Sequence, residues 1–204
     1  MYIPEQYKND NEQEIRDFLQ KNSFGILVNQ TDGKLWATHI PLELDINENG
    51  KQVLNGHLSK ENPQWKSFAS DTQVLAIFSG SHSYISASWY DHENVPTWNY
   101  IAVHVYGTIK IVEGEALMRG LKKLVDKYES NSENPVRIEE LSKKTMMQTR
   151  GIVAFEIEID DIQAVKKMSQ NRDDKNYQNI ISELEKTGKP DAEAVAEVMK
   201  KCPR

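Results

Sequence analysis

The chain has one cysteine among its 204 residues, Cys202, and it has no long apolar run. A single cysteine excludes an internal disulfide and any zinc or iron–sulfur site built from clustered cysteines. No segment approaches the roughly 18 consecutive apolar residues of a membrane span, so no membrane partner is expected. The first residues show neither the basic nor the apolar part of a secretion signal. The expected location is therefore the cytoplasm.

Positive charge is also scarce, because 25 lysines and arginines stand against 31 aspartates and glutamates, a formal net charge of −6. A protein that binds DNA usually presents a basic face, because neutralisation of the DNA phosphates gives most of the non-specific binding affinity. The lysine pairs at 122–123, 143–144, 166–167 and 200–201 each lie near acidic residues. Such pairs are typical of solvated helix faces. Strong direct DNA binding is therefore not expected.

Several familiar catalytic motifs are missing. The sequence has no glycine-rich phosphate loop of the common spacings, no His-Glu-x-x-His and no Gly-x-Ser-x-Gly. His82, His92 and His104 could converge on a metal ion, but their spacing does not require it. Surface or hydrogen-bonded structural roles are the simpler interpretation. The residues therefore predict no metal site and leave any catalytic residue unknown.

Aromatic residues are the most informative feature present. Residues 83–107, SYISASWYDHENVPTWNYIAVHVYG, contain two tryptophans, four tyrosines and two histidines, and all tryptophans and histidines lie between Trp36 and His104. Such side chains can stack on a flat ligand and hydrogen-bond its edges. The alternative is that they fill the core of a β-protein. Composition alone does not separate these two interpretations.

Residue patterns predict mainly strands after a first helix. Asn11 or Asp10 can cap a helix that ends near Asn22, with Glu14 completing the capping pattern. Asp32-Gly33 suits a hairpin turn between two apolar segments, and a second turn lies at 48–50. Asn62-Pro63 can start a short helix that turns Trp65 and Phe68 inward. Further strands are predicted at 52–57, 74–78, 98–112, 152–159 and 162–168, and helices at 115–128, 138–147 and, as a pair, within 176–200. Six or seven strands with few helices between them predict an antiparallel β-barrel rather than a doubly wound sheet.

One turn suits a terminal phosphate. In the segment GHLSKENPQW, at residues 56–65, Ser59 offers a hydroxyl and Lys60 an ammonium group where a strand ends and a helix begins. A charged donor, a neutral donor and the dipoles of a helix start all favour an anion. The alternative is an ordinary turn whose lysine points into solvent. These residues alone do not decide between them.

Six sequence blocks in order give the chain a resemblance to a known family. It resembles the PaiB family of FMN-binding regulators, within the flavin-binding split-barrel group that includes pyridoxamine-phosphate oxidase. The blocks are MYIPEQY at 1–7, ATHIPLELD at 37–45, GHLSKENPQW at 56–65, YISASWY at 84–90, VPTWNYIAVHVYG at 95–107 and KMSQNR at 167–172.

The resemblance implies a homodimeric FMN-binding split β-barrel with the cofactor in a cleft between subunits. Residues 1–172 would form the barrel domain, and residues 173–204 a helical extension packed on it. Thr38, His39 and Ile40 would run along the flavin ring, while Ser59 and Lys60 would hold the phosphate. The remaining candidate cofactor contacts are His57, Asn62, Trp89, Trp98, Gln170, Asn171 and Arg172. Which subunit supplies which contact is left open.

Two hypotheses about function follow. One is a flavin-dependent regulator or sensor, with possible latent oxidoreductase chemistry carried by the flavin. The other is a repressor that acts directly on DNA, with the flavin structural or absent. The negative charge favours indirect regulation through a protein or small-molecule partner. No reductant or substrate is identified by the sequence.

Overall fold

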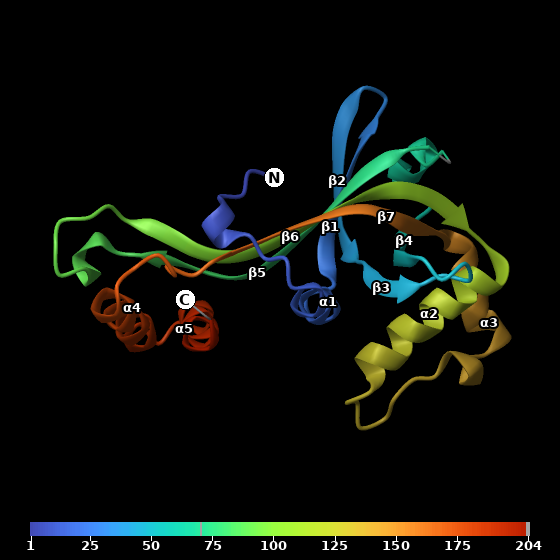
Figure 1. The fold of residues 1–204 in the computed structure, drawn as a ribbon. Helices are drawn as coiled ribbons and strands as arrows, with labels where there is room; N and C mark the ends of the chain where they lie inside the picture. The colour runs from blue at the N-terminus through green and yellow to red at the C-terminus, as the bar shows by residue number, and fades with distance from the viewer. Residues whose placement is uncertain (70, 203–204) are drawn as a thin grey trace. The chain divides into compact units, whose positions relative to one another are not determined.

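The computed structural model describes residues 1–69 and 71–202. Five α-helices, five 3₁₀ turns and seven strands follow one another along the chain (Figure 1). The helices are α1 (Glu12–Lys21), α2 (Gly114–Glu129), α3 (Lys143–Met146), α4 (Asp174–Lys186) and α5 (Pro190–Lys201). The strands are β1 (Phe24–Thr31), β2 (Lys34–Pro41), β3 (Glu43–Ile46), β4 (Gln52–Ser59), β5 (Gln73–Ile85), β6 (Thr97–Val112) and β7 (Ile152–Lys167). The 3₁₀ turns are η1 (Glu5–Tyr7), η2 (Pro63–Ser67), η3 (Ala87–Trp89), η4 (Ile138–Glu140) and η5 (Met147–Gly151).

The strands form one seven-stranded sheet in the order β2-β1-β5-β6-β7-β4-β3. Strand β1 pairs antiparallel with β2 and β5, and β4 pairs antiparallel with β3 and β7. The predicted mainly β, antiparallel fold with helices is therefore confirmed. In the described residues the sheet is not closed, since β2 and β3 form its two edges.

Local signals correctly predicted several boundaries. Asp32 and Gly33 have φ angles of 50° and 76°, which makes the two-residue turn that joins β1 to β2. Asn11 Oδ1 accepts a hydrogen bond from the Glu14 backbone N–H at 3.0 Å and so caps α1. The carboxylate of Glu14 does not complete the capping box, because it pairs with Lys166 at 2.6 Å. The predicted helix pair within 176–200 is present as α4 and α5, and Pro190 occupies the start of α5.

Two predicted elements were wrong. The helix expected at 138–147 is instead η4, α3 and η5, because Leu141 and Ser142 are extended and Ser142 caps a new turn. The two strands expected at 152–159 and 162–168 are one continuous strand, β7 (Figure 1). Asp160-Asp161 lacks the glycine or proline that a tight turn favours, and Asp160 accepts a hydrogen bond from Thr108 at 3.2 Å.

The chain divides into two compact units. The first contains residues 1–18, 78–104 and 163–204, and the second contains residues 19–77 and 105–162. Strands β5, β6 and β7 each contribute residues to both units. The C-terminal helices α4 and α5 belong to the first unit. A domain boundary at residue 172 stays a prediction.

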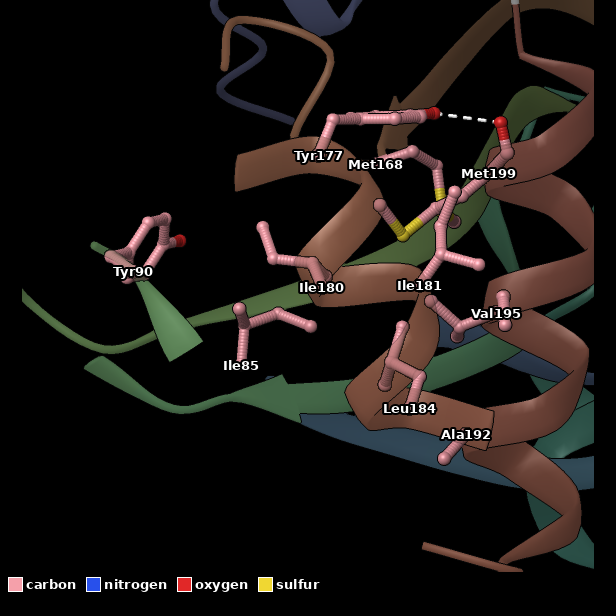
Figure 2. Packing of buried hydrophobic residues seen from close by; sticks show 11 residues of the cluster. Ile85, Tyr90, Met168, Tyr177, Ile180, Ile181, Leu184, Ala192, Val195 and Met199 are labelled. Atoms are coloured by element: carbon pink, nitrogen blue, oxygen red, sulfur yellow. Dashed lines mark hydrogen bonds between the residues drawn. The ribbon is translucent and has the colours of Figure 1, made fainter. Parts of the chain in front are cut away.

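The first unit has a core built from α4 and α5 (Figure 2). Its members are Ile85, Tyr90, Met168, Tyr177, Ile180, Ile181, Leu184, Ala192, Val195, Ala196 and Met199. Tyr177 donates its hydroxyl to the Met199 carbonyl at 2.7 Å, and burial raises the pKa of this phenol to about 12. A neutral tyrosine therefore ties α4 to α5 inside an apolar cluster.

The second unit has its own core against the sheet. Phe68 and Phe155 meet edge to face with ring centroids 5.4 Å apart. Leu27, Leu54 and Ile157 are fully buried. In the described residues, no helix combines the length and apolar character needed to cross a membrane.

Candidate functional site

The middle of β2 and the start of η2 meet in a hydrogen-bond network in the second unit. Thr38 donates its hydroxyl to Gln64 Oε1 at 2.5 Å and accepts a hydrogen bond from Asn62 Nδ2 at 2.9 Å. Asn62 Oδ1 caps η2 by accepting from the Gln64 backbone N–H at 3.0 Å. Two of the predicted cofactor contacts, Thr38 and Asn62, are thus brought together. Gln64, which links them, was not predicted.

Gln64 is fully buried and acts as the centre of this network. Its amide nitrogen donates to the Leu27 carbonyl at 3.2 Å and to Asn29 Oδ1 at 2.8 Å. Asn29 in turn donates to Ser67 Oγ at 2.7 Å. A buried polar network of this kind holds its members in one arrangement, because any broken bond leaves an unsatisfied polar group. The buried network therefore holds the side chains of Thr38 and Asn62 in one orientation.

Ser59 is the last residue of β4 and Lys60 follows it, and both are exposed. The Lys60 backbone N–H donates to the Gly151 carbonyl at 2.9 Å, and Ser59 Oγ accepts from the Glu61 backbone N–H at 3.2 Å. The backbone of the turn is thereby held against the start of β7. The Lys60 ammonium group has no partner in residues 1–69 and 71–202, so its charge is available to a ligand.

His39 and Ile40 follow Thr38 on β2, where their side chains alternate. Ile40 is 8% exposed and belongs to the core, so it can present mainly its backbone to a ligand. His39 is exposed and stacks on Phe24 with ring centroids 6.4 Å apart. Since β2 is an edge strand, its free backbone groups are also accessible.

His57 lies on β4 in a different environment. It lines a pocket with Gly56 and Phe155, beneath Leu117 and Leu121 of α2. Burial lowers the pKa of the His57 imidazole, so the ring is mainly neutral at pH 7. This apolar setting suits a neutral hydrogen-bonding role better than a contact with phosphate.

The predicted tryptophans belong to the first unit. Trp89, in η3, packs against the α4–α5 core and is partly buried. Trp98, on β6, is 53% exposed. Its ring lies 5.9 Å from that of Tyr84, edge to face, and 6.1 Å from that of His82. Trp98 therefore belongs to an exposed aromatic surface, whereas Trp89 is largely structural.

The last predicted contacts follow β7 in the first unit. Gln170 uses its side chain locally, since it accepts from the Met168 N–H and donates to the Lys166 carbonyl, both at 2.7 Å. Asn171 is exposed. The Arg172 guanidinium lies over the Tyr90 ring, 5.1 Å from its centroid. The candidate contacts thus fall into two groups, one in each unit.

Two of the three histidines considered for a metal site have separate partners. His82 lies against Trp98, and His92 pairs with Asp91 at 2.9 Å. In the described part of the chain, no group of three or more metal-ligating side chains is found.

The fold defines the class of protein. The chain resembles the FAD and heme binding protein from Mycobacterium smegmatis, with a TM-score of 0.63 and 16% identity over 84% of this chain and 78% of that one. It also resembles the flavocytochrome Anf3 from Azotobacter vinelandii, with a TM-score of 0.62 and 14% identity over 85% and 75% of the two chains. At these identities the likeness concerns the fold alone, which is the split barrel of flavin-binding proteins.

The family follows from sequence. Residues 1–161 match the family described as "Putative FMN-binding domain". The chain is 44% identical over 200 residues to "Protease synthase and sporulation protein PAI 2" of Bacillus subtilis, covering 98% of this chain and 96% of that protein. It is 28% identical over 234 residues to the uncharacterized protein AN0679 of Emericella nidulans, covering 91% of each. The chain belongs to this family, and the resemblance to PaiB is confirmed.

Proposed function

We propose that this protein binds FMN in its split barrel and acts as a flavin-dependent regulator or sensor. The observation that carries the proposal is the hydrogen-bond network of Thr38, Asn62 and Gln64. Lys60 lies two residues before Asn62 in the chain, and its ammonium group has no partner in residues 1–69 and 71–202. Membership of an FMN-binding family supports the choice of flavin. A rigid polar framework with an uncompensated cation in a neighbouring residue of the chain is a combination that suits a phosphate-bearing cofactor.

The residues present fit this cofactor. Ser59 and Lys60 would hold the phosphate, Thr38 and His39 would hydrogen-bond the flavin edge, and the Ile40 backbone would lie beside them. The flavin, when bound, supplies redox chemistry, while the protein contributes binding, orientation and exclusion of water.

We also propose that the chain is a homodimer that binds FMN at two equivalent sites. The exposed aromatic surface at Tyr84 and Trp98 supports this, since interfaces are enriched in such residues. In analytical ultracentrifugation monitored at a flavin absorbance wavelength, we expect a dimer that sediments with about one FMN per chain. A monomer that retains FMN would contradict the dimer alone. A colourless dimer that takes up no FMN would contradict the cofactor assignment alone.

The printed name of the Bacillus subtilis relative refers to protease synthesis and sporulation. We propose that this protein regulates by binding a protein or small-molecule partner, because its net charge of −6 disfavours direct binding to DNA. We expect no sequence-specific mobility shift of promoter DNA at about 150 mM salt. A nanomolar shift that is absent on scrambled DNA would instead support a direct repressor.

A further inference from the structure

The apolar side of α2 faces a cavity of the second unit. Leu117, Leu121 and Leu124 lie on one side of this helix at helical spacing. A surface helix normally buries such residues in a core, yet in the described chain no residue of α2 is buried. The three leucines instead line a cavity between α2 and strands β4 and β7, together with Phe155. The helix therefore covers this part of the sheet without closing on it.

Three ion pairs connect one side of α2 to β3 and the turn after it. The cations lie four residues apart, so they follow one face of the helix. The pairs are Arg119 with Glu48 at 3.0 Å, Lys123 with Asp45, and Lys127 with Glu43 at 2.6 Å. Ion pairs near the surface contribute less to stability than a buried apolar interface does. Because α2 has no buried side chain to expose, its outward movement breaks little beyond these pairs.

The cavity under α2 adjoins a further cavity at each end. The central one has a volume of about 20 Å³, which is enough for about one water molecule. Val112 and Ala116 also line a second cavity of about 120 Å³, toward the start of α2. Glu43, Asn55 and Gly120 also line a third of about 300 Å³, toward its end. A small outward shift of the helix would join these spaces.

His57 is the polar side chain of the central cavity that lacks a partner. It is half-buried, and in residues 1–69 and 71–202 its imidazole has no hydrogen-bond or ion-pair partner. Glu43 and Asn55, which line the same cavity, are engaged with Lys127 at 2.6 Å and with Asp45 at 3.0 Å. Burial lowers the pKa of the imidazole, and a neutral ring offers one donor and one acceptor. The cavity thus favours an uncharged hydrogen-bonding group.

We propose that the space between α2 and strands β4 and β7 binds a small uncharged molecule with an apolar body and one hydroxyl group, and that α2 is its lid. The apolar body would lie against the leucines of α2, and the hydroxyl would hydrogen-bond the His57 imidazole. In the described chain, the FMN contacts proposed at Thr38, Ser59, Lys60 and Asn62 line none of the three cavities. The inference therefore does not depend on FMN binding.

The test uses phenol and toluene, which have nearly the same size and differ in one hydroxyl group. Each is titrated at pH 7 into isotope-labelled protein and followed by NMR. We expect both to shift amide resonances at 56–57 and 116–124, because both rings fit the leucine side of the cavity. No binding at millimolar concentrations, or shifts at Tyr84 and Trp98 in place of these residues, would overturn the proposal. Release of bound FMN by phenol would show that the two sites are not separate.

Two substitutions in the cavity separate its polar and apolar parts. His57→Leu removes both ring nitrogens, so the affinity for phenol should fall about fivefold relative to that for toluene, the effect of one neutral hydrogen bond. An unchanged ratio of the two affinities would exclude His57 from the site. Ala116→Leu fills the cavity from α2 while His57 stays in place, and it should weaken both ligands. If it binds both as tightly as the parent does, they bind elsewhere.

Two adjacent lysines of α2 test the lid. Lys123→Gln removes an ion pair to β3 and should strengthen phenol binding several-fold, because the closed position of α2 loses a contact that the open position lacks. Lys122→Gln is the matched control, since Lys122 pairs with Asp126 of α2 and Glu139 of η4. It should leave phenol affinity at the parent value. Equal phenol affinity in the two variants would overturn the assignment of α2 as a lid.

Discussion

Replacing Lys60 with alanine is expected to weaken FMN binding about 10- to 100-fold and to leave the fold intact. The ammonium group is exposed and has no partner in the described part of the chain, so its removal breaks no contact within the protein. A hydrogen bond between a charged donor and a phosphate contributes about 1.5–3 kcal/mol, which corresponds to this range of affinity. Fluorescence titration of the apoprotein with FMN measures the effect.

Two controls make this test specific. Riboflavin lacks the phosphate, so Lys60→Ala and the parent should bind it weakly and with similar affinity. Lys66→Ala removes another exposed lysine, from the nearby turn η2, and should leave FMN affinity unchanged. If Lys60→Ala binds FMN as tightly as the parent does, Lys60 is not part of the site.

Features governed by neighbouring residues could be predicted from the sequence. The Asp32-Gly33 turn requires positive φ angles that this dipeptide tolerates, and it is present. Asn62 caps η2 through its own side chain, as a proline at the next position suggested. The strand predicted at 98–112 is present as β6, in which Val103 and Val105 are buried while Tyr100 and Ala102 are not.

The two errors have different causes, one local and one in the pairing of the sheet. Residues 138–147 have apolar residues at helical spacing, yet Ser142 starts a new turn and divides the segment. The polar pair Asp160-Asp161 suggested a break between strands, but pairing in the sheet carries β7 through it. The second outcome cannot be derived from the residues of the segment alone.

The candidate site was only partly accessible to sequence reasoning. Thr38 and Asn62 came from family resemblance, whereas Gln64, which joins them, became visible only when β2 and η2 met in space. Lys167 lies in the block KMSQNR, and nothing in the sequence distinguishes it from the adjacent Lys166. Only the position of Glu14 distinguishes the two lysines, and that contact spans 152 residues of chain.

Gly107→Ala is expected to lower the free energy of unfolding by about 3 kcal/mol or more. Gly107 lies on β6, and an added Cβ would come within 2.2 Å of the Glu158 carbonyl oxygen and 2.7 Å of Ile157 Cγ2. The first of these atoms is backbone of the neighbouring strand β7, so a change of rotamer cannot relieve the overlap. The strands would have to separate, at the cost of packing in the core of the second unit.

Gly120→Ala is the matched control, because the same methyl group is added where there is room for it. Gly120 lies inside α2, and nothing is within 4 Å of the added Cβ. Alanine in a helix interior is favoured over glycine by about 0.5–1 kcal/mol, so this variant should be slightly more stable than the parent. Urea unfolding followed by circular dichroism measures both variants. If the free energy of unfolding of Gly107→Ala lies within about 0.5 kcal/mol of the parent value, the change is no larger than that of an ordinary surface substitution. That result would show that β6 and β7 can separate at this position without loss of stability.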